Sequence, residues 1–137
     1  MESGNSHSSI LAEVFSEKLP AEGKNSRFRC ECAYDGTDFC GWQSQKSGGS
    51  VQDFIEARLG QILKKPIRIH GSGRTDSGVH ATGQVFHFDA VWDHPAYALL
   101  AALRSTNRTD VFVKSLKRVG NDFHARYSAK GKRYVYY

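Results

Sequence analysis

Apolar and polar residues alternate along the segment that begins at Arg27. Every second side chain of this segment is apolar: Phe28, Cys30, Cys32 and Tyr34. A period of two is typical of a β-strand that buries one face. The turn signal Asp35-Gly36 follows directly. We therefore expect a first strand over residues 27–34.

A different spacing follows the polar, glycine-rich stretch 43–49. The apolar residues now recur at helical spacing: Val51, Phe54, Ile55, Leu59, Ile62 and Leu63. This pattern predicts an α-helix with one apolar face. Ser50 can cap the N-terminus of the helix, and Asp53, three residues later, completes a capping-box pattern. Pro66 ends the helix.

The remaining apolar runs predict strands at 67–70, 84–90, 111–119 and 133–137 and a helix at 95–105. Asp93 is expected to cap this helix, and Pro95 is tolerated in its first turn. The order is β-α-β-β-α-β with one extra C-terminal strand. It predicts an α+β fold of the ferredoxin-like, RRM-like type, in which an antiparallel sheet carries both helices on one face.

The first 26 residues are rich in Ser, Gly and Glu, and we expect them to form a disordered leader ahead of one domain at 27–137. This leader has neither the basic nor the apolar region of a signal peptide. The longest apolar stretch, 98–103, falls far short of the ~18 residues that a membrane span needs. We expect no membrane association and an intracellular location, in the cytoplasm, the nucleus or an organelle.

The positive charge of the chain is concentrated after the leader. Two of the 19 basic residues and four of the 14 acidic residues lie in residues 1–26, so residues 27–137 carry a formal net charge of +7. Residues 114–137 contain seven basic residues and one acidic residue, Asp122. Such a local field attracts phosphate groups, so nucleic acid is a candidate partner alongside a merely basic surface.

Polar residues gather in the segment 71–80, which reads Gly-Ser-Gly-Arg-Thr-Asp-Ser-Gly-Val-His. Arg74 stands two residues before Asp76, a spacing that suits an ion pair and keeps the carboxylate ionised. An ionised, positioned carboxylate can act as a nucleophile or base. The alternative is a long hairpin loop held by a surface Arg–Asp pair, which contributes little energy.

Three other patterns are set aside. Gly71-Ser72-Gly73 lacks the third glycine of a dinucleotide-binding fingerprint. Asp76-Ser77-Gly78 resembles the aspartic-protease triplet, but the neighbouring Arg74 disfavours a pair of carboxylates that shares a proton. Cys30-x-Cys32, considered with Cys40 and His70, lacks the spacing of a zinc-ligand pair and a second pair. We expect reduced, buried strand thiols and no metal site.

The predicted central strand 84–90 carries two phenylalanines, Phe86 and Phe88. RNA-recognition modules stack bases on aromatic residues in such a strand. The run Gly83–Phe88 lacks the aromatic residue that follows the glycine in the octamer of those modules. A core role for both rings is therefore favoured. His87 and His94 have no partner that the sequence reveals.

Several segments, taken together, resemble the TruA-type tRNA pseudouridine synthases. The matching segments are Tyr34-Asp35-Gly36 with Phe39 and Gly41-Trp42-Gln43, Ser50-Val51-Gln52, 73–81, Gly83-Gln84-Val85, 122–129 and 132–136. They occur in family order from residue 27 to the last residue. The segment Gly-Arg-Thr-Asp-x-Gly-Val-His is highly specific to this family.

The resemblance implies isomerisation of uridine to pseudouridine in tRNA, within the anticodon stem-loop, without a cofactor. Asp76 matches the catalytic aspartate of the family and would be the nucleophile. Arg74 matches the arginine that pairs with it and helps to displace the base, and Tyr134 matches the tyrosine that packs on the base. Further substrate contacts are implied for Thr75, His80 and Arg126. Contacts to the RNA backbone are expected from Lys114, Lys130, Lys132 and Arg133.

The resemblance covers only the N-terminal half of the family's catalytic core. We therefore expect the partners to be tRNA or another structured RNA, together with a missing second half or a second copy of the chain. The alternative is a catalytically silent RNA-binding or dimerisation module that keeps the fold.

Overall fold

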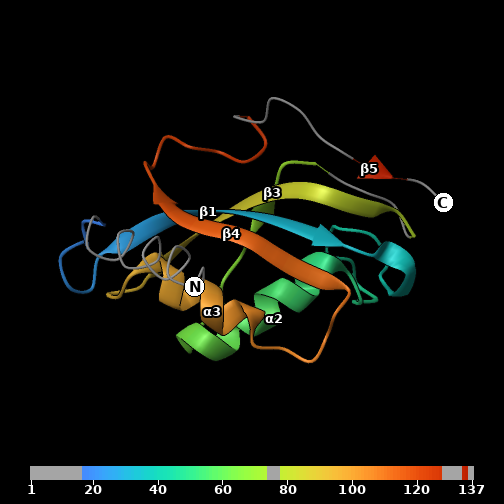
Figure 1. Ribbon diagram of the computed structural model, residues 1–137, viewed down its shortest axis with the longest axis horizontal. Coiled ribbons are helices and arrows are strands. Elements are labelled where there is room, and N and C mark those ends of the chain that lie inside the picture. Colours follow the sequence, from blue (N-terminus) through green and yellow to red (C-terminus); the bar gives the residue numbers. More distant parts are fainter. Residues whose placement is uncertain (1–16, 74–77, 128–133, 136–137) are drawn as a thin grey trace, which may run out of the picture.

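The computed structural model describes residues 17–73 and 78–127 and the backbone of 134–135. Its elements in chain order are β1 (Asn25–Tyr34), the short 3-10 helix η1 (Gly36–Asp38), α2 (Val51–Leu63), β2 (His70–Gly71), β3 (His80–Val91), α3 (Ala96–Arg104), β4 (Val111–Val119) and β5 (Tyr134–Val135). The strand order across the antiparallel sheet is β2-β3-β1-β4, and β5 pairs with β3. Both helices lie on one side of the sheet (Figure 1). The predicted α+β order is confirmed.

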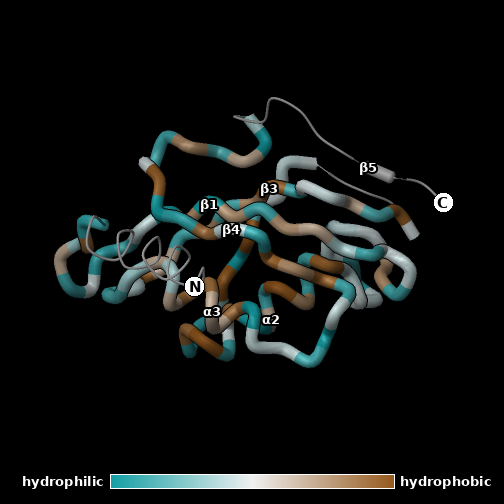
Figure 2. The backbone as a smooth tube through the Cα atoms, in the orientation of Figure 1, coloured by the Kyte–Doolittle hydropathy of each residue, from teal (hydrophilic) through white to brown (hydrophobic). Residues whose placement is uncertain are grey.

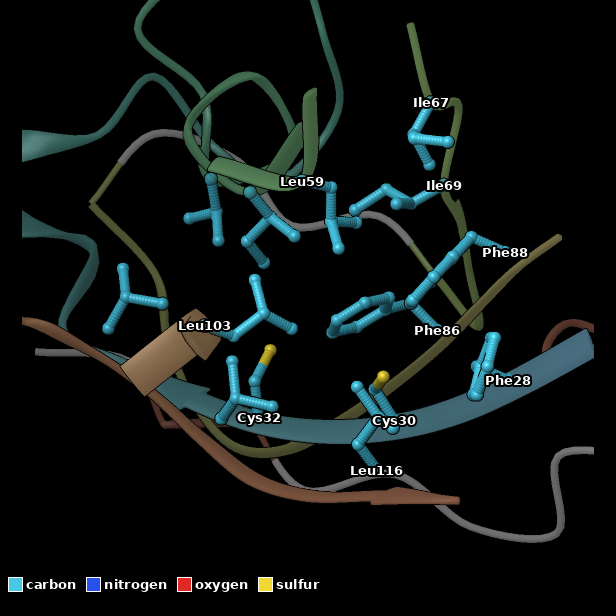
Figure 3. Close-up of a cluster of buried hydrophobic side chains, with 14 of the residues drawn as sticks. Phe28, Cys30, Cys32, Leu59, Ile67, Ile69, Phe86, Phe88, Leu103 and Leu116 are labelled. Atoms are coloured by element: carbon cyan, nitrogen blue, oxygen red, sulfur yellow. The ribbon is translucent and has the colours of Figure 1, made fainter. Parts of the chain in front are cut away.

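One face of the sheet forms the core with the two helices. The even-numbered positions of β1 from Ser26 to Tyr34 are buried, as the alternation predicted. Phe28 lies opposite Phe88 and Cys30 opposite Phe86 in the β1–β3 register. Figure 3 shows Leu59 of α2 and Leu103 of α3 directed at these strands. Figure 2 shows the hydrophobic positions of both helices in brown. Phe86 and Phe88 are fully buried, so their core role is confirmed.

The other face of the sheet carries the odd-numbered positions of β1, and no helix of the described residues lies on it. Arg29 of β1 lies opposite His87 of β3 in the register. After β4 the chain turns onto this side of the sheet (Figure 1). The Arg27 guanidinium of β1 holds this segment, because its Nη1 donates to the carbonyls of Asn121 and Phe123. Its Nη2 donates to Asp89 of β3. The segment after β4 therefore covers part of the helix-free face.

The predicted capping box at the start of α2 is present. The Asp53 amide donates to Ser50 Oγ at 3.0 Å, and the Ser50 amide donates to Asp53 Oδ2 at 3.3 Å. Burial raises the pKa of the Asp53 carboxyl, but hydrogen bonds from Ser44 and Ser50 outweigh it, so the pKa lies below its ordinary value. Two backbone donors that lack helical partners are satisfied in this way.

We predict that Ser50→Ala lowers the free energy of unfolding by about 1 kcal/mol, because it leaves the Asp53 amide without its acceptor. Ser47→Ala is the matched control, since Ser47 is exposed in the turn that precedes the helix. Urea denaturation followed by circular dichroism measures both variants. Equal midpoints for the two would show that the box does not stabilise α2.

The expected cap of α3 is wrong. Pro95 occupies the N-cap position and makes no side-chain cap hydrogen bond. The Ala96 amide donates instead to Glu17 Oε1 at 2.8 Å, and the Asp93 carboxylate accepts from the amide of Gly23. A residue 79 positions earlier in the chain therefore satisfies the donor that Asp93 was expected to cap.

Some strand boundaries also differ from the prediction. β3 begins four residues before the predicted strand, at His80. In 67–70 only His70 pairs, together with Gly71, although Ile67 and Ile69 are buried as expected. Residues 134–135 of the predicted strand 133–137 form β5, and its other residues lie outside the described residues. Burial of apolar side chains holds 67–69 in place without strand pairing.

Part of the predicted leader contacts the folded body. Glu17 accepts from the Arg118 guanidinium, which also lies 5.1 Å above the Phe28 ring. Ser26 is buried, and β1 begins at Asn25. Residues 1–16 of the predicted leader lie outside the described residues. In the described part of the chain, no helix has the length and apolar character required to cross a membrane.

Candidate functional site

A cleft of about 560 Å³ opens between β2, the loop before α2 and the segment after β4. Its lining residues are Trp42, Gln43, Gln52, Arg68, Ile69, His70, Gly71, Ser72, Gly73, His124, Arg126 and Tyr127. Trp42 packs directly on Gly71, where a Cβ would lie 2.3 Å from the indole nitrogen. Most of the polar lining comes from two short segments, 68–73 and 124–127. Of these segments only His70 and Gly71 belong to the sheet, so the walls of the cleft are mostly formed by loops.

The segment 74–77, which carries Arg74, Thr75 and Asp76, leaves from the edge of this cleft at Gly73. These residues lie outside the described residues. The chain before them is anchored by Gln84, a buried residue of β3 whose Nε2 donates to the Gly73 carbonyl at 2.7 Å. Ser72 Oγ lies 3.4 Å from Gln84 Oε1. A buried amide in the core of the sheet thus holds the start of the loop.

The chain after the loop is anchored at the corner between β1 and η1. A Cβ at Gly36 would lie 1.9 Å from the Val79 carbonyl oxygen, so only glycine allows this close approach. The Gly36 amide donates to His80 Nδ1 at 2.9 Å, and Asp35 Oδ1 lies 2.9 Å from the same nitrogen. The pKa of Asp35 is lowered mainly by its hydrogen bonds from Thr37. Both ends of the loop are therefore held by β3 and its neighbours.

Three histidines from separate segments meet on the helix-free face. The His70 ring lies 4.9 Å from that of His87, and the His124 ring 4.6 Å from it. His87 Nδ1 accepts the Ala125 amide at 3.0 Å, and His124 Nδ1 accepts the Arg126 amide at 3.2 Å. Both nitrogens are acceptors and so carry no proton. Burial lowers the pKa of His87 to about 4, and burial also lowers the pKa of His124.

This arrangement predicts that stability falls on mild acidification. The unfolded chain binds a proton at His87 near pH 6.5, whereas the folded chain does so near pH 4. Between these values the unfolded state binds more protons, so the free energy of unfolding decreases as the pH falls from 6.5 to 4. Thermal unfolding at several pH values in this window measures the effect.

His87→Asn keeps an acceptor for the Ala125 amide but removes the titration, so it should flatten the pH profile. His94→Asn makes the same chemical change at an exposed histidine and should leave the wild-type profile in place. An unchanged profile in His87→Asn would show that His87 is not the group responsible.

The predicted substrate-binding residues are only partly brought together. Arg126 lines the cleft. His80 lies at the β1–η1 corner, outside the cleft lining, next to the Ala81–Tyr134 pair of β3 and β5. Of the predicted RNA-backbone residues, Lys114 donates to the Thr82 carbonyl at 2.8 Å and lies 3.4 Å from Glu31. The predicted residues Lys130, Lys132 and Arg133, and the side chain of Tyr134, lie outside the described residues.

The cysteines behave as two classes. Cys30 and Cys32 are buried, and burial raises the pKa of both thiols well above the ordinary value. The expectation of buried strand thiols is confirmed for these two residues. Cys40, which lies in the loop after η1, is exposed. Among the described residues, no group of three His, Cys, Asp or Glu side chains is arranged to hold a metal ion.

The histidine cluster and the anchor at Gln84 were not predicted from the sequence. Side chains alternate between the two faces of a strand, and His87 lies between the core residues Phe86 and Phe88. The sequence of β3 therefore already places His87 on the opposite face. Gln84 lies two residues before Phe86 and therefore points to the same face, which places its amide in the core. Its bond to Gly73 became visible only in the fold.

Comparison with known proteins places the chain in a family. The family model described as tRNA pseudouridine synthase matches residues 32–128. A protein of Dechloromonas aromatica named tRNA pseudouridine synthase A is 50% identical over 103 residues, which are 75% of this chain and 39% of that protein. Proteins of the same name from Exiguobacterium sibiricum and Latilactobacillus sakei are 43% and 49% identical over 111 residues.

The last two matches cover 81% and 80% of this chain and 45% of each relative. The chain thus spans less than half the length of these relatives. The matched region includes the loop 74–77, its anchors at Gly36 and Gln84, and both walls of the cleft. The chain therefore belongs to the tRNA pseudouridine synthase family.

Proposed function

We propose that the protein isomerises uridine to pseudouridine in tRNA, with Asp76 as the nucleophile. The observation that carries the proposal is the family match across the loop 74–77 and the cleft at its edge. The relatives are named tRNA pseudouridine synthase A. A positioned carboxylate next to an arginine is the chemistry that the isomerisation needs.

The reaction moves one bond and changes no atom count. The C1′–N1 bond breaks, the base turns, and a C5–C1′ bond forms. The proton on C5 is lost, and N1 gains a proton. Asp76 would add to the base or the sugar and leave again when the new bond forms, so neither a redox partner nor a transferred group is needed. Arg74 would keep the Asp76 carboxylate ionised.

The target uridine must leave its base stack to reach Asp76, which requires a few kcal/mol. We propose that Thr75, His80 and Arg126 contact the extruded nucleotide and that Tyr134 packs on its base. Backbone contacts from Lys114, Lys130, Lys132 and Arg133 would offset the energy of extrusion. The uridines of the anticodon stem-loop are the proposed targets.

We also propose that the site is completed by a second polypeptide half or by a second copy of the chain. β5 supports this, because among the described residues it lies at the edge of the sheet, where Tyr134 pairs with Ala81 and Val135 with His80. An edge strand presents backbone groups that another segment can pair with.

The test measures tritium release from unmodified tRNA labelled at C5 of uridine. The chain is assayed alone and after addition of the C-terminal part of a relative. Release above background in either reaction supports the proposed function. Binding of tRNA without release in both reactions would overturn it and leave the RNA-binding module as the function.

A further inference from the structure

Tyr127 is an exposed aromatic side chain at the mouth of the cleft. It exposes 81% of its surface, more than the exposed aromatic residues Tyr97 (43%) and Phe112 (51%). Its ring lies 4.5 Å from that of His124. His124 in turn packs edge-on against the buried His87. One face of an aromatic pair is thus supported by the core, while the tyrosine side is open to a ligand.

The turn that carries this pair is fixed before any ligand binds. The Phe123 amide donates to the Gly120 carbonyl at 3.0 Å. The Ala125 amide donates to His87 Nδ1, and the Arg126 amide donates to His124 Nδ1. A rigid aromatic surface loses little conformational freedom on binding, so an exposed ring held in this way is suited to recognition.

Two guanidinium groups line the same cleft. Arg68 exposes 69% of its side chain, and its Nε lies 4.0 Å from Glu56 Oε2, at the limit of an ion pair. That oxygen already accepts hydrogen bonds from Gln52 and from the Ile69 amide. Arg126 is exposed and forms no ion pair within the described residues. Both cations therefore remain available to an anion.

An exposed ring in the same cleft as two available cations matches a nucleotide rather than an apolar peptide. Proteins bind single-stranded RNA by stacking bases on aromatic rings, while cations contact the backbone. The net charge of the chain is +5, which favours a polyanion. Gly73, the last described residue before the loop 74–77, lines the same cleft. A base seated on Tyr127 would thus lie near the loop of the reacting uridine.

We propose that Tyr127 and His124 form a stacking platform for one unpaired base next to the reacting uridine, with Arg68 and Arg126 on the flanking phosphates. This inference rests on the proposed function for the identity of the ligand as RNA. The platform binds a second nucleotide, because the resemblance assigns the target base to Tyr134. It would keep the extruded segment unstacked from the rest of the RNA.

The test compares two probes of equal charge, a single-stranded octauridylate and an octamer of the same backbone without bases. Tyr127→Ala should weaken binding of octauridylate by about 5- to 100-fold, because one base loses its stacking partner. The same variant should bind the abasic octamer as the wild type does. Tyr127→Phe should keep the wild-type affinity for both, since the ring remains. Tyr97→Ala, on α3, is the control for loss of an exposed tyrosine.

Salt dependence separates stacking from charge. Tyr127→Ala should leave the slope of log affinity against log salt unchanged, whereas Arg126→Ala should lower its magnitude by roughly 0.7. Equal losses on both octamers, or no loss on either, would overturn the platform. Neither probe requires turnover, so a platform that binds octauridylate can be found even if no pseudouridine is formed. Conversely, if the chain forms pseudouridine but Tyr127→Ala binds octauridylate as the wild type does, the platform is excluded and the proposed function stands.

Discussion

Asp76→Asn is expected to reduce pseudouridine formation by about 10³-fold or more while the affinity for tRNA stays within about threefold. Asparagine has nearly the size of aspartate but cannot form the bond to the nucleotide. Loss of a nucleophile removes the covalent step rather than weakening it. RNA binding should persist, because a carboxylate does not attract an anionic ligand.

The measurement is tritium release at saturating tRNA, in whichever preparation of the chain shows turnover, with affinity determined in parallel. Asp38→Asn is the matched control, since Asp38 is an exposed carboxylate in η1, away from the cleft lining. Near-normal turnover in Asp76→Asn would exclude this residue as the nucleophile. The segment 71–80 would then return to its alternative interpretation as a structural hairpin loop.

Phe86→Ala is expected to lower the free energy of unfolding by about 3–5 kcal/mol. Phe86 is fully buried at the centre of the sheet, 5.8 Å from the Trp42 ring and 6.4 Å from the Phe88 ring. Truncation removes its apolar contacts and leaves a cavity that the neighbouring rings cannot fill. Domains of this size are stable by only about 5–15 kcal/mol, so the variant should unfold at a much lower urea concentration.

The control for this variant is Phe112→Ala on β4 of the same sheet. Phe112 is 51% exposed, so the same chemical change there should lower stability by about 1 kcal/mol or less. Urea denaturation measures both. Similar midpoints for the two variants would contradict the assignment of Phe86 to the core.

The elements of the fold were predictable wherever one physical requirement dominated. In β1 a single face is buried, so the period of two gave the strand from Phe28 to Tyr34. In α2 the apolar spacing and the Ser50–Asp53 box act within one turn of helix, and both are local. The limits of β4 were predicted without error at Val111 and Val119. The order of these elements then left few ways to form an antiparallel sheet.

The errors arose where a distant residue replaced a local one. Asp93 has the chemistry of an N-cap, but the Ala96 amide is satisfied by Glu17, and Asp93 turns to Gly23. Cys40 has the same side chain as Cys30 and Cys32, yet it is exposed, whereas its loop neighbours Phe39 and Trp42 are buried. Neither outcome has a sequence signal, since each depends on which segment the fold brings nearby.

The candidate site was likewise predictable in part from the sequence and in part only from the fold. The sequence by itself identified the loop that carries Arg74 and Asp76, because its unusual residues are contiguous and specific to one family. Only the tertiary structure assembled the cleft at its edge, from β2 and the turn that ends at Tyr127. It also showed that Gln84 holds Gly73 and that His87 fixes the turn. These contacts join residues 11 and 38 positions apart, and their energy exists only when the sheet sets their distance and excludes water.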